Sequence, residues 1–497
     1  MGSILLIRSN LIFHKIFRKR NLAVILLTVL IYLIHFGITY TPLKTEQAKQ
    51  NSKLATQLTY YFQNNLRPNC DELNEYTKSS QAMWQYYGYP DNNDQFNKQS
   101  LSKLLKISND QEASLKSIHR SLLEQVLTEA NPIYRGYLNL MNDFYSTDSQ
   151  GIVYVSGKEY YWLTIVSIKY IRDRLHDDIP IEIFMPHKDK HDQFCNKMRL
   201  VFGNIFCSYF DQYLPRHVIS EMSGYQFKSL ALLLTRFNHV LYLDSDNIPL
   251  IEPSKLFESE KYKTHGMIVW PDFWKRSTNP LYYSFTNLQF EVIGTTPSVE
   301  SGQMLINKRT HLKTLLLSYY YNLYGPTYFY PLFSQGFPGE GDKESFYLAS
   351  RATKEGSFLP SGIKTQICGV LDSKNAFSGN AILQVDPSDF NKIAFFHSNY
   401  PKIQVDKLDK SYYTDKITKS NRRSWSLIRG ARKETDNNTG LKSLKEKLNF
   451  DLELAVWESM FELCSVDFKG FRLFDGIGND EMADQLKERV AYLKHAD

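Results

Sequence analysis

The sequence predicts an α/β fold, a doubly wound sheet with helices on both faces. After Gln150, short β-branched runs alternate with stretches whose apolar residues recur at helical spacing, which is typical of strands connected by helices. Hydrophobic residues make up 42% of the chain and aromatic residues 14%, so most of it should fold around a core. Its 497 residues suffice for one large domain of this kind with additional segments.

An uncharged apolar run, Leu22–Tyr40, precedes that domain and has about the length that a helix needs to cross a bilayer. Basic residues come before the run. The positive-inside rule therefore predicts a cytosolic tail at 1–21, a transmembrane signal-anchor at 22–40 and the rest of the chain across the membrane. A cleaved signal peptide is the alternative, but its apolar core is usually only about 7–15 residues and ends in a small-residue cleavage site. The stretch GITYTPL offers no such site.

The formal net charge of +6 comes from the N-terminus. Residues 1–45 contain six Lys or Arg and no acid, so residues 46–497 are neutral overall. A general nucleic-acid binder carries its charge on the folded domain, so this distribution argues against a nucleic-acid partner. One stretch, 402–447, holds 13 Lys or Arg and 6 Asp or Glu. It is either a solvated linker or a surface for anionic ligands.

Residues 41–145 are predicted to form a stem with helical segments. Residues 41–100 are rich in Gln, Asn, Ser, Lys and Thr with scattered apolar positions, which suits a stem that holds a domain away from the membrane. From Leu101 to Ala130 the apolar spacing is helical, so the stem should end in one or two helices packed on the main domain.

The main domain is predicted to span 146–410, followed by the basic segment and a helical extension at 411–497. Its expected strands are Gly151–Gly157, Ile179–Pro186, Asn204–Phe210, His239–Asp246, His265–Trp274, Glu300–Asn307 and Lys392–Lys402, and its expected helices are Tyr160–Leu175, 189–201 and Tyr225–Phe237. Ligands of such sheets bind at the carboxyl ends of the strands.

Five cysteines are consistent with one or two disulfides in an oxidising lumen and one thiol left over. Cys195 and Cys207 flank one short hydrophobic segment and are the best candidates for a bridge, although sequence alone does not settle the pairing. No C-x-x-C occurs, which argues against a thiolate zinc site. The sequon Asn437–Thr439 would be usable in the secretory pathway.

The stretch HVLYLDSDNIPL places Asp244 and Asp246 at the carboxyl end of an expected strand. Side chains at i and i+2 of a strand point to the same side, so the two carboxylates should face one point. Like charges this close are costly unless a cation lies near them, and Mn²⁺ or Mg²⁺ prefers such oxygen ligands. The ion would then neutralise the charge of a departing nucleotide diphosphate. The alternative is a simple turn, with Asn247 and Pro249 supplying the turn chemistry.

Four blocks of the sequence carry a resemblance to a known family: YQFKSLALLLTRFNHVLYLDSDNIPL, GMIVWPDFW, ESGQMLIN and GEGDKESFYLA. In this order, and with the anchor topology, the chain resembles the fungal MNN family of Golgi α-mannosyltransferases. These are type II membrane proteins that build the branches of cell-wall mannan. The match runs from Gly151 to His397. The resemblance implies a GT-A-like doubly wound mixed sheet, GDP-mannose as the donor, a Mn²⁺-type ion and retention of the α configuration.

The resemblance makes Asp244 and Asp246 the ion and nucleotide residues. Lys228, in the helix before them, is either a contact for the donor phosphates or an exposed helix lysine. Gly157, which ends the first strand, would let the nucleotide approach the backbone closely.

His397 lies at a late strand end, with Lys402 five residues on. In other metal-dependent retaining transferases of this fold, a late histidine completes the ion's coordination and a nearby lysine holds the diphosphate. By analogy His397 would be a metal ligand and Lys402 a donor contact. An ordinary surface or core histidine is the alternative.

The loop Gly339–Phe346 gathers Glu340, Asp342 and Glu344 among glycines. Asp342 and Glu344 are the candidate catalytic residues, because either carboxylate could hydrogen-bond the acceptor hydroxyl or the transferred mannose. A retaining enzyme of this class needs no strong covalent nucleophile, and the departing phosphate can itself take the acceptor proton. No general base is therefore assigned.

Asp272 and Gln303 are polar residues next to apolar strand ends and are candidates for substrate binding. Trp270 joins them, because its ring or that of Trp274 could stack on a sugar face. The alternative makes the tryptophans core residues, and we expect that for at least one of them.

These observations predict a retaining transferase of the Golgi membrane that moves mannose from GDP-mannose to mannosyl acceptors of N-glycan outer chains or cell-wall mannan. The blocks YLDSDNIPL and GDKESF resemble the α-1,2 branch-adding members of the family, with an α-1,3 capping activity as the alternative. Another alternative is a catalytically silent scaffold subunit in a complex with other Golgi mannosyltransferases. The presence of both aspartates favours an enzyme.

Overall fold

The computed structural model of the chain describes residues 45–77, 96–157, 160–292, 296–337, 339, 341–360, 365–371, 375, 377–399, 402, 423–430, 440–463 and 479–495. The predicted tail, the signal-anchor at 22–40, Glu340 and the sequon Asn437–Thr439 lie outside these residues. None of the helices within them has the length and apolarity that crossing a membrane requires. The chain divides into two compact units, Met1–Gln50 and Asn51–Asp497, and the contacts given below belong to the second.

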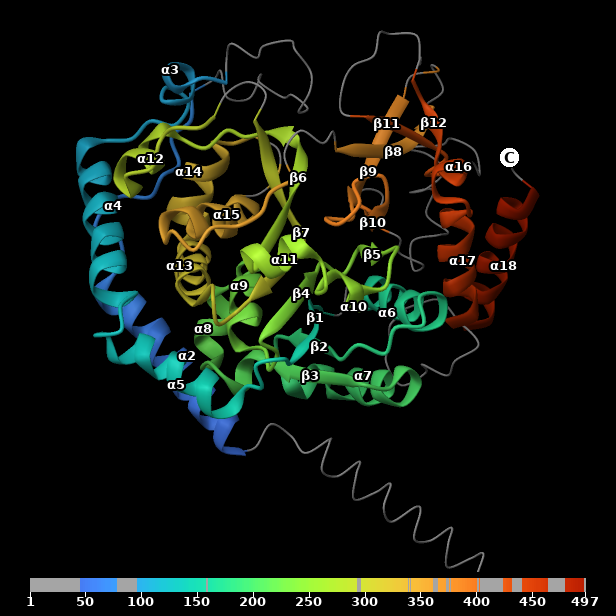
Figure 1. Cartoon of the computed structure of the whole chain (residues 1–497), viewed down its shortest axis with the longest axis horizontal. Coiled ribbons are helices and arrows are strands. Elements are labelled where there is room, and N and C mark those ends of the chain that lie inside the picture. Colours follow the sequence, from blue (N-terminus) through green and yellow to red (C-terminus); the bar gives the residue numbers. More distant parts are fainter. Residues whose placement is uncertain are drawn as a thin grey trace, which may run out of the picture. The chain divides into compact units, whose positions relative to one another are not determined.

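Six strands form the first sheet, in the order β3-β2-β1-β4-β7-β6 (Figure 1). They are β1 (Gln150–Val155), β2 (Ile181–Met185), β3 (Ile205–Tyr209), β4 (His239–Leu243), β6 (Met267–Lys275) and β7 (Pro297–Asn307). The first four are parallel, whereas β7 is antiparallel to both β4 and β6, so the sheet is mixed. Each of these strands overlaps one of the predicted runs, and the α/β class is confirmed.

Helices cover both faces of this sheet because alternate residues of its strands point in opposite directions. Val153 and Tyr242 lie in one core with α9, α13 and α15, while Ile152 and Leu243 lie in another with α6 and α7 (Figure 1). The helices are α6 (Tyr161–Lys169), α7 (Lys188–Phe202), α9 (Gln226–Leu234), α13 (Leu312–Leu323) and α15 (Asp342–Ala352). Burial on both faces explains why the central strands read as nearly continuous apolar runs.

A second sheet of six strands has the order β12-β11-β8-β9-β10-β5. Its strands are β5 (Asn247–Pro249), β8 (Gln366–Leu371), β9 (Phe377–Val385), β10 (Ile393–His397), β11 (Leu427–Gly430) and β12 (Lys442–Ser443). Every pairing in it is antiparallel. Of these strands only β10 lies in a run that the sequence analysis assigned to a strand of its own. Three helices follow in the chain, α16 (Leu444–Leu448), α17 (Leu452–Leu463) and α18 (Asn479–His495). Trp457 of α17 and Leu486 of α18 lie in the same core as Phe395 of β10.

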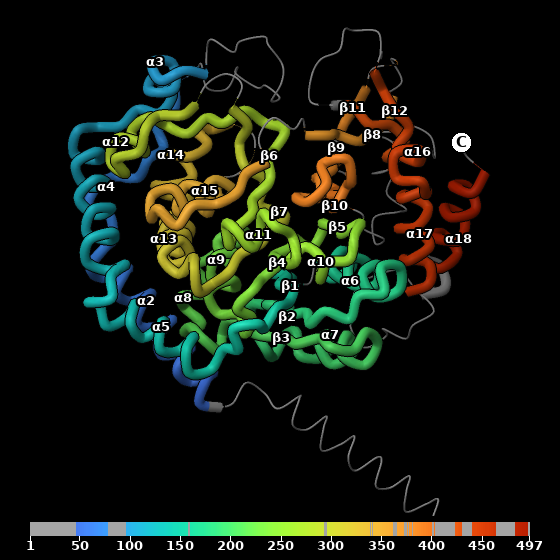
Figure 2. Tube along the Cα trace, viewed as in Figure 1, coloured from blue at the N-terminus to red at the C-terminus, as the bar shows by residue number. Residues whose placement is uncertain are grey.

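The described parts of the predicted stem, residues 51–77 and 96–145, contribute side chains to the first core. Figure 2 shows the path of their backbone. They form α2 (Thr45–Asn65), α3 (Lys98–Leu101), α4 (Asn109–Ser121) and α5 (Pro132–Phe144). In α2, Phe62 packs edge-on against Tyr320 with ring centroids 5.2 Å apart, and Thr59 shares a 2.7 Å hydrogen bond with the Tyr319 hydroxyl. Within Leu101–Ala130, where one or two helices are predicted, α4 begins after Ser108, which caps it by accepting from the backbone N–H of Gln111.

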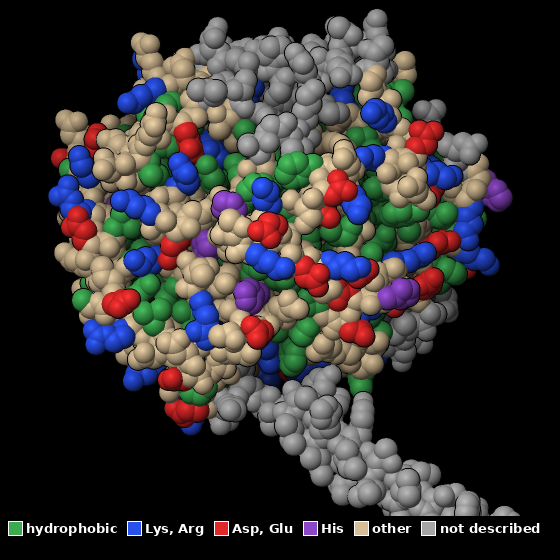
Figure 3. Space-filling model, in the orientation of Figure 1, with side chains coloured by type: hydrophobic (Ala, Val, Ile, Leu, Met, Phe, Trp, Pro, Cys, Tyr) green, Lys and Arg blue, Asp and Glu red, His purple; other side chains and the backbone are tan. Residues whose placement is uncertain are grey.

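Five further α-helices lie among the described residues. They are α8 (Arg216–Glu221), α10 (Pro253–Leu256), α11 (Glu260–His265), α12 (Pro280–Thr286) and α14 (Tyr330–Ser334). On the face shown in Figure 3, Lys and Arg alternate with Asp and Glu rather than gathering by sign.

The predicted disulfide is confirmed. Cys195 of α7 bonds to Cys207 of β3, with the two Cα atoms 6.0 Å apart, so the bridge fastens the helix to the edge strand that follows it. Cys70 and Cys368 are free thiols, and Cys464 lies outside the described residues.

Candidate metal and donor site

The two predicted aspartates lie where the chain leaves the first sheet and enters the second. β4 ends just before Asp244 and β5 begins just after Asp246, so the aspartates occupy the turn between the two strands. The backbone N–H of Asp244 donates to the carbonyl of Gly302 in β7 at 2.8 Å, and the carbonyl of Asp246 accepts from the N–H of Ser398 after β10 at 3.0 Å. The turn is therefore held by one sheet at its start and by the other at its end.

His397 joins the aspartates because β10 pairs with β5. The antiparallel register sets His397 opposite Asn247, and its Nε2 lies 3.2 Å from Oδ1 of Asp246. One ligand atom from each of Asp244, Asp246 and His397 lies within 4.8 Å of the others. The carboxylates thus converge through a turn, not through the alternation along one strand that the sequence analysis assumed. Strand pairing adds the imidazole.

Glu300 lies on the other side of the imidazole. Oε1 of Glu300 lies 3.5 Å from Nδ1 of His397 and accepts the backbone N–H of Gly302 at 2.6 Å. Burial disfavours the imidazolium, but the carboxylates of Glu300 and Asp244 outweigh it and raise the pKa of His397. Burial would raise the pKa of Glu300, yet His397 and the Gly302 N–H lower it to about 2. The ring fits only because residue 302 is glycine, since a Cβ there would lie 2.4 Å from Cε1 of His397.

Lys228 is a buried cation, not an exposed helix lysine. It is 3% exposed and lies in the first turn of α9, where Nζ is 3.3 Å from Oδ2 of Asp244 and 3.2 Å from Oδ2 of Asp342. Nζ also donates to Oγ of Ser301 at 3.0 Å. Burial opposes its charge, but the carboxylates of Asp244, Asp342 and Glu300 outweigh burial and raise the pKa of Lys228. Lys228 therefore bridges α15 to the aspartate turn.

Lys402 contacts the other aspartate. Its Nζ donates to Oδ2 of Asp246, and its side chain is 36% exposed. Burial lowers the pKa of Lys402, and the nearby Asp244 carboxylate opposes that effect. Because the Lys402 side chain is partly exposed, it can move to contact an anion, as a role in binding a donor phosphate requires.

The two candidate acids of α15 lie in different surroundings. Asp342 faces the aspartate turn through Lys228 and Ser301, and burial raises its pKa against the opposing charge of Lys228. Glu344 instead lies 3.2 Å from Nε of Arg276 and accepts the backbone N–H of Val299 at 3.0 Å. Asp342 is thus brought to the cluster, whereas Glu344 belongs to a buried ion pair.

Of the predicted substrate-binding residues, Trp270 does not have the predicted position. It is fully buried, donates from Nε1 to the Val385 carbonyl at 2.9 Å and packs edge-on against Phe395 at 5.2 Å. Trp270 is therefore a core residue, the alternative that the sequence analysis considered, and its ring is not available to a sugar. Trp274 is partly buried, with its ring centroid 4.7 Å from that of Phe273.

Asp272 and Gln303 are both buried. Asp272 accepts hydrogen bonds from Lys343 and, at 3.2 Å, from Ser298, and burial raises its pKa against the opposing Lys343 charge. Gln303 accepts from Nδ2 of Asn247 at 2.6 Å. Its own Nε2 has no acceptor among the described residues, which leaves a buried donor beside the aspartate turn.

Gly157 lies two residues beyond the end of β1. Because β1 and β4 are parallel, it lies at the same edge of the sheet as the aspartate turn. Ser245, between the two aspartates, accepts from Thr164 at 2.9 Å and donates to the Val155 carbonyl at 3.1 Å, which ties that turn to the end of β1. A Cβ on Gly157 would meet nothing within 4 Å, so open space lies beside its backbone.

The charges of the cluster leave a place for a dication. Besides the two turn aspartates, Asp342 and Glu300 supply carboxylates, while Lys228 and Lys402 supply two ammonium groups. When the imidazole is neutral, as a metal ligand must be, two negative charges remain in excess. Two carboxylates and an imidazole are a donor set that suits Mn²⁺. The residues present therefore fit such an ion.

Sequence reasoning missed three contributors to this site, Glu300, Ser301 and Gly302. All three stand in ESGQMLIN, where only Gln303 was singled out. The signal available was the glycine inside the predicted strand, since glycine inside a strand often marks a close approach.

Comparison with known proteins places the chain among sugar transferases. Residues 149–293 and 287–386 match the family described as "Mannosyltransferase putative". The chain is 30% identical to the α-1,2-mannosyltransferase MNN21 of Candida albicans, over 86% of this chain and 73% of that protein. It is 30% identical to the α-1,2-mannosyltransferase MNN2 of Saccharomyces cerevisiae, over 79% of this chain and 76% of that protein.

Solved structures overlap the chain in part. The galactosyltransferase LgtC, in complex with donor and acceptor sugar analogues, has a TM-score of 0.28 and 12% identity, over 42% of this chain and 72% of its own. Mouse xyloside xylosyltransferase 1 has a TM-score of 0.28 and 13% identity, over 42% of this chain and 84% of its own. At these TM-scores neither overlap bears on the chemistry of the site, which rests on the side chains described above.

Proposed function

The chain belongs to this mannosyltransferase family, as its resemblance predicts, and we propose that it moves mannose from GDP-mannose to mannosyl acceptors of N-glycan outer chains or cell-wall mannan. We propose an α-1,2 linkage, made with retention of the α configuration. The observation that carries the proposal is the convergence of Asp244, Asp246 and His397 beside two lysines. The full-length relatives are α-1,2-mannosyltransferases, which supports this linkage over an α-1,3 one.

The proposed ion is Mn²⁺, held by Asp244, Asp246 and His397. When bound, it supplies positive charge to the diphosphate that leaves with GDP. Glu300 keeps the imidazole turned so that Nε2 faces the aspartates. Lys402 exchanges its contact with Asp246 for a donor phosphate, since its side chain is partly exposed.

Lys228 has a positioning role in this proposal. It is held by Asp244, Asp342 and Ser301 and is almost fully buried, so its charge fixes the aspartate turn against α15. Asp342 is the acid of α15 assigned to the acceptor hydroxyl or the transferred mannose. No base is required of it, because the leaving phosphate can take the acceptor proton.

The wider setting is also proposed. The mixed sheet with its aspartate turn supports a GT-A fold, and the apolar run Leu22–Tyr40 supports a single-pass type II anchor in the Golgi membrane. Complexes with other Golgi mannosyltransferases fit the same location.

A transfer assay tests the proposal. The full-length protein in detergent is incubated with GDP-mannose, an α-mannobiose acceptor and Mn²⁺, and the product linkage is read by NMR. We expect an α-1,2-linked product that disappears in excess EDTA and in Asp246→Asn. An α-1,3 product would move the assignment to the capping activity. A wild-type protein that binds Mn²⁺ but transfers nothing would favour the silent scaffold subunit.

A further inference from the structure

A hollow of about 600 Å³ lies at the start of α9 and is lined by aromatic rings. Its walls include Tyr76, Tyr225, Tyr330 and Phe337, and we call it the aromatic hollow. Tyr225 is 52% exposed and Tyr76 is 38% exposed. Two large exposed rings around one hollow are costly for a water-soluble domain and are typical of a binding surface.

The walls of the aromatic hollow run directly into the site along the chain. One wall, residues 223–226, leads into the first turn of α9, which carries Lys228. The other wall includes Gly339, three residues before Asp342 at the start of α15. Lys228 and Asp342 are 3.2 Å apart, so both walls end at the same ion pair. Tyr330 also packs on the segment between them, since a Cβ on Gly341 would lie 2.4 Å from its Cα.

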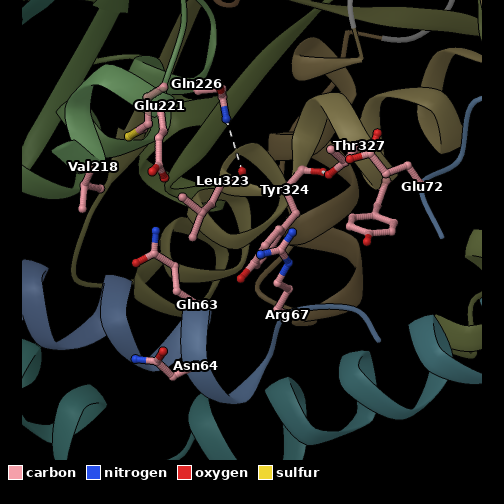
Figure 4. A pocket seen from close by; sticks show the side chains of 12 residues that line it. Gln63, Asn64, Arg67, Glu72, Val218, Glu221, Gln226, Leu323, Tyr324 and Thr327 are labelled. Atoms are coloured by element: carbon pink, nitrogen blue, oxygen red, sulfur yellow. Dashed lines mark hydrogen bonds between the residues drawn. The ribbon is translucent and has the colours of Figure 1, made fainter. Parts of the chain in front are cut away.

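A second hollow of about 400 Å³ adjoins the first, and Gln226 lines both. We call it the polar hollow. Figure 4 shows Gln63 from α2 and Glu221 from α8 pointing toward it from opposite sides, with Arg67 nearby. Within the described part of the chain, these three side chains form no hydrogen bond or ion pair, so their polar groups are available to a ligand.

The two linings match the two kinds of surface on a sugar. Aromatic faces pack against the apolar C–H face of a pyranose ring, while amide, carboxylate and guanidinium groups bond to hydroxyls. The charge of Arg67 is offset by Glu221 and Glu72 in the same hollow, which suits a neutral ligand better than a phosphate. The occupant that fits both hollows is a neutral oligosaccharide longer than one unit.

We propose that the aromatic hollow and the polar hollow together bind the acceptor chain, an oligomer of α-linked mannose. The aromatic hollow takes the unit next to the mannose that receives the transfer, and the polar hollow takes the unit beyond it. This inference rests on the proposed function, because it names where the acceptor of that reaction lies. Affinity then grows with acceptor length until both hollows are filled.

Acceptor-length kinetics test the inference. KM and kcat are measured for the full-length protein with α-linked mannose oligomers of increasing length and saturating GDP-mannose. Truncating an interface tyrosine that packs on its ligand costs enough to raise KM roughly tenfold. We expect that rise in Tyr225→Ala for the longer oligomers, with little change for the shortest, while Tyr225→Phe keeps the wild-type values because its ring face remains. Glu221→Gln should raise KM only for oligomers long enough to reach the polar hollow.

Phe390→Ala is the matched control, because Phe390 is 42% exposed and lies outside both hollows. Thermal unfolding confirms that each variant is folded. Equal KM values for wild type and Tyr225→Ala across all lengths would overturn the inference, provided that the wild type transfers mannose. If the wild type transfers nothing, the proposed function fails. Direct calorimetric titration with the longest oligomer then still decides whether Tyr225 binds it.

Discussion

Replacing Gly302 by alanine tests whether the orientation of His397 controls the site. The new Cβ would lie 2.4 Å from Cε1 and 2.5 Å from Nδ1 of His397, and 3.0 Å from Oε1 of Glu300. The backbone at Gly302 is outside the left-handed region, so alanine is opposed by these contacts alone. His397 is 5% exposed and held by Asp246 and Glu300, so the ring cannot swing freely away.

Two magnitudes follow for Gly302→Ala. Ordinary van der Waals contact begins near 3.4 Å, so the ring must move by about 1 Å. Overpacking of this kind lowers the free energy of unfolding by about 1–3 kcal/mol. Disturbing the residues that orient a metal ligand lowers metal affinity by about 10- to 100-fold.

The assay is a calorimetric titration with Mn²⁺, followed by urea unfolding of the same preparation. The control is Gly136→Ala in α5, whose Cβ would meet Cδ2 of Leu54 at 2.5 Å, the flexible end of a side chain. We expect Gly302→Ala to lose Mn²⁺ affinity and Gly136→Ala to keep it. Unchanged Mn²⁺ affinity in Gly302→Ala would refute the argument that the fixed imidazole is part of an ion site.

Three further predictions concern stability. Removing the bridge with Cys195→Ser and Cys207→Ser, which opens a loop with a sequence separation of 12, should lower the free energy of unfolding in urea by about 3 kcal/mol relative to the oxidised wild type. The reduced wild type is the control and should match the variant. Glu344→Gln should lower it by about 3 kcal/mol because Arg276 loses its closest buried carboxylate, and an unchanged urea midpoint would contradict this. Burial lowers the pKa of Lys308 to about 7 in the folded protein. Between about pH 7 and pH 10 the unfolded chain therefore binds one proton more at this lysine than the folded protein does. The unfolding free energy should therefore rise between pH 7 and pH 9 relative to Lys308→Met, and parallel curves for the two proteins would exclude the shift.

Much of the first sheet could be predicted because the local sequence of each strand shows its pattern. Runs such as IPIEIFMP and HVLYLDSD are β-branched or apolar, short, and separated by helical patterns, and burial on both faces demands that composition. The second sheet was not predicted as a sheet. Its pairings join residues far apart in the chain, such as Leu427 with Gly369, and no local pattern encodes which segments pair.

The site shows the same division. Asp244, Asp246 and His397 were predicted from motif and resemblance, but their approach depends on β5 pairing with β10, a contact across about 150 residues of chain. Trp270 was assigned to substrate binding because the sequence pattern of a tryptophan beside a polar strand end is the same in a core and in a sugar-binding site. Glu300 was missed because its role appears only once His397 packs against Gly302.

The most direct test of the central claim is whether GDP binding depends on the ion. GDP is titrated into the full-length protein with Mn²⁺ and with EDTA, for the wild type and for Asp246→Asn. The account predicts that GDP binds the wild type tightly only with Mn²⁺, and that Asp246→Asn loses this dependence together with most of the affinity. Equal GDP affinity in Mn²⁺ and in EDTA, or full Mn²⁺-dependent binding by Asp246→Asn, would contradict it.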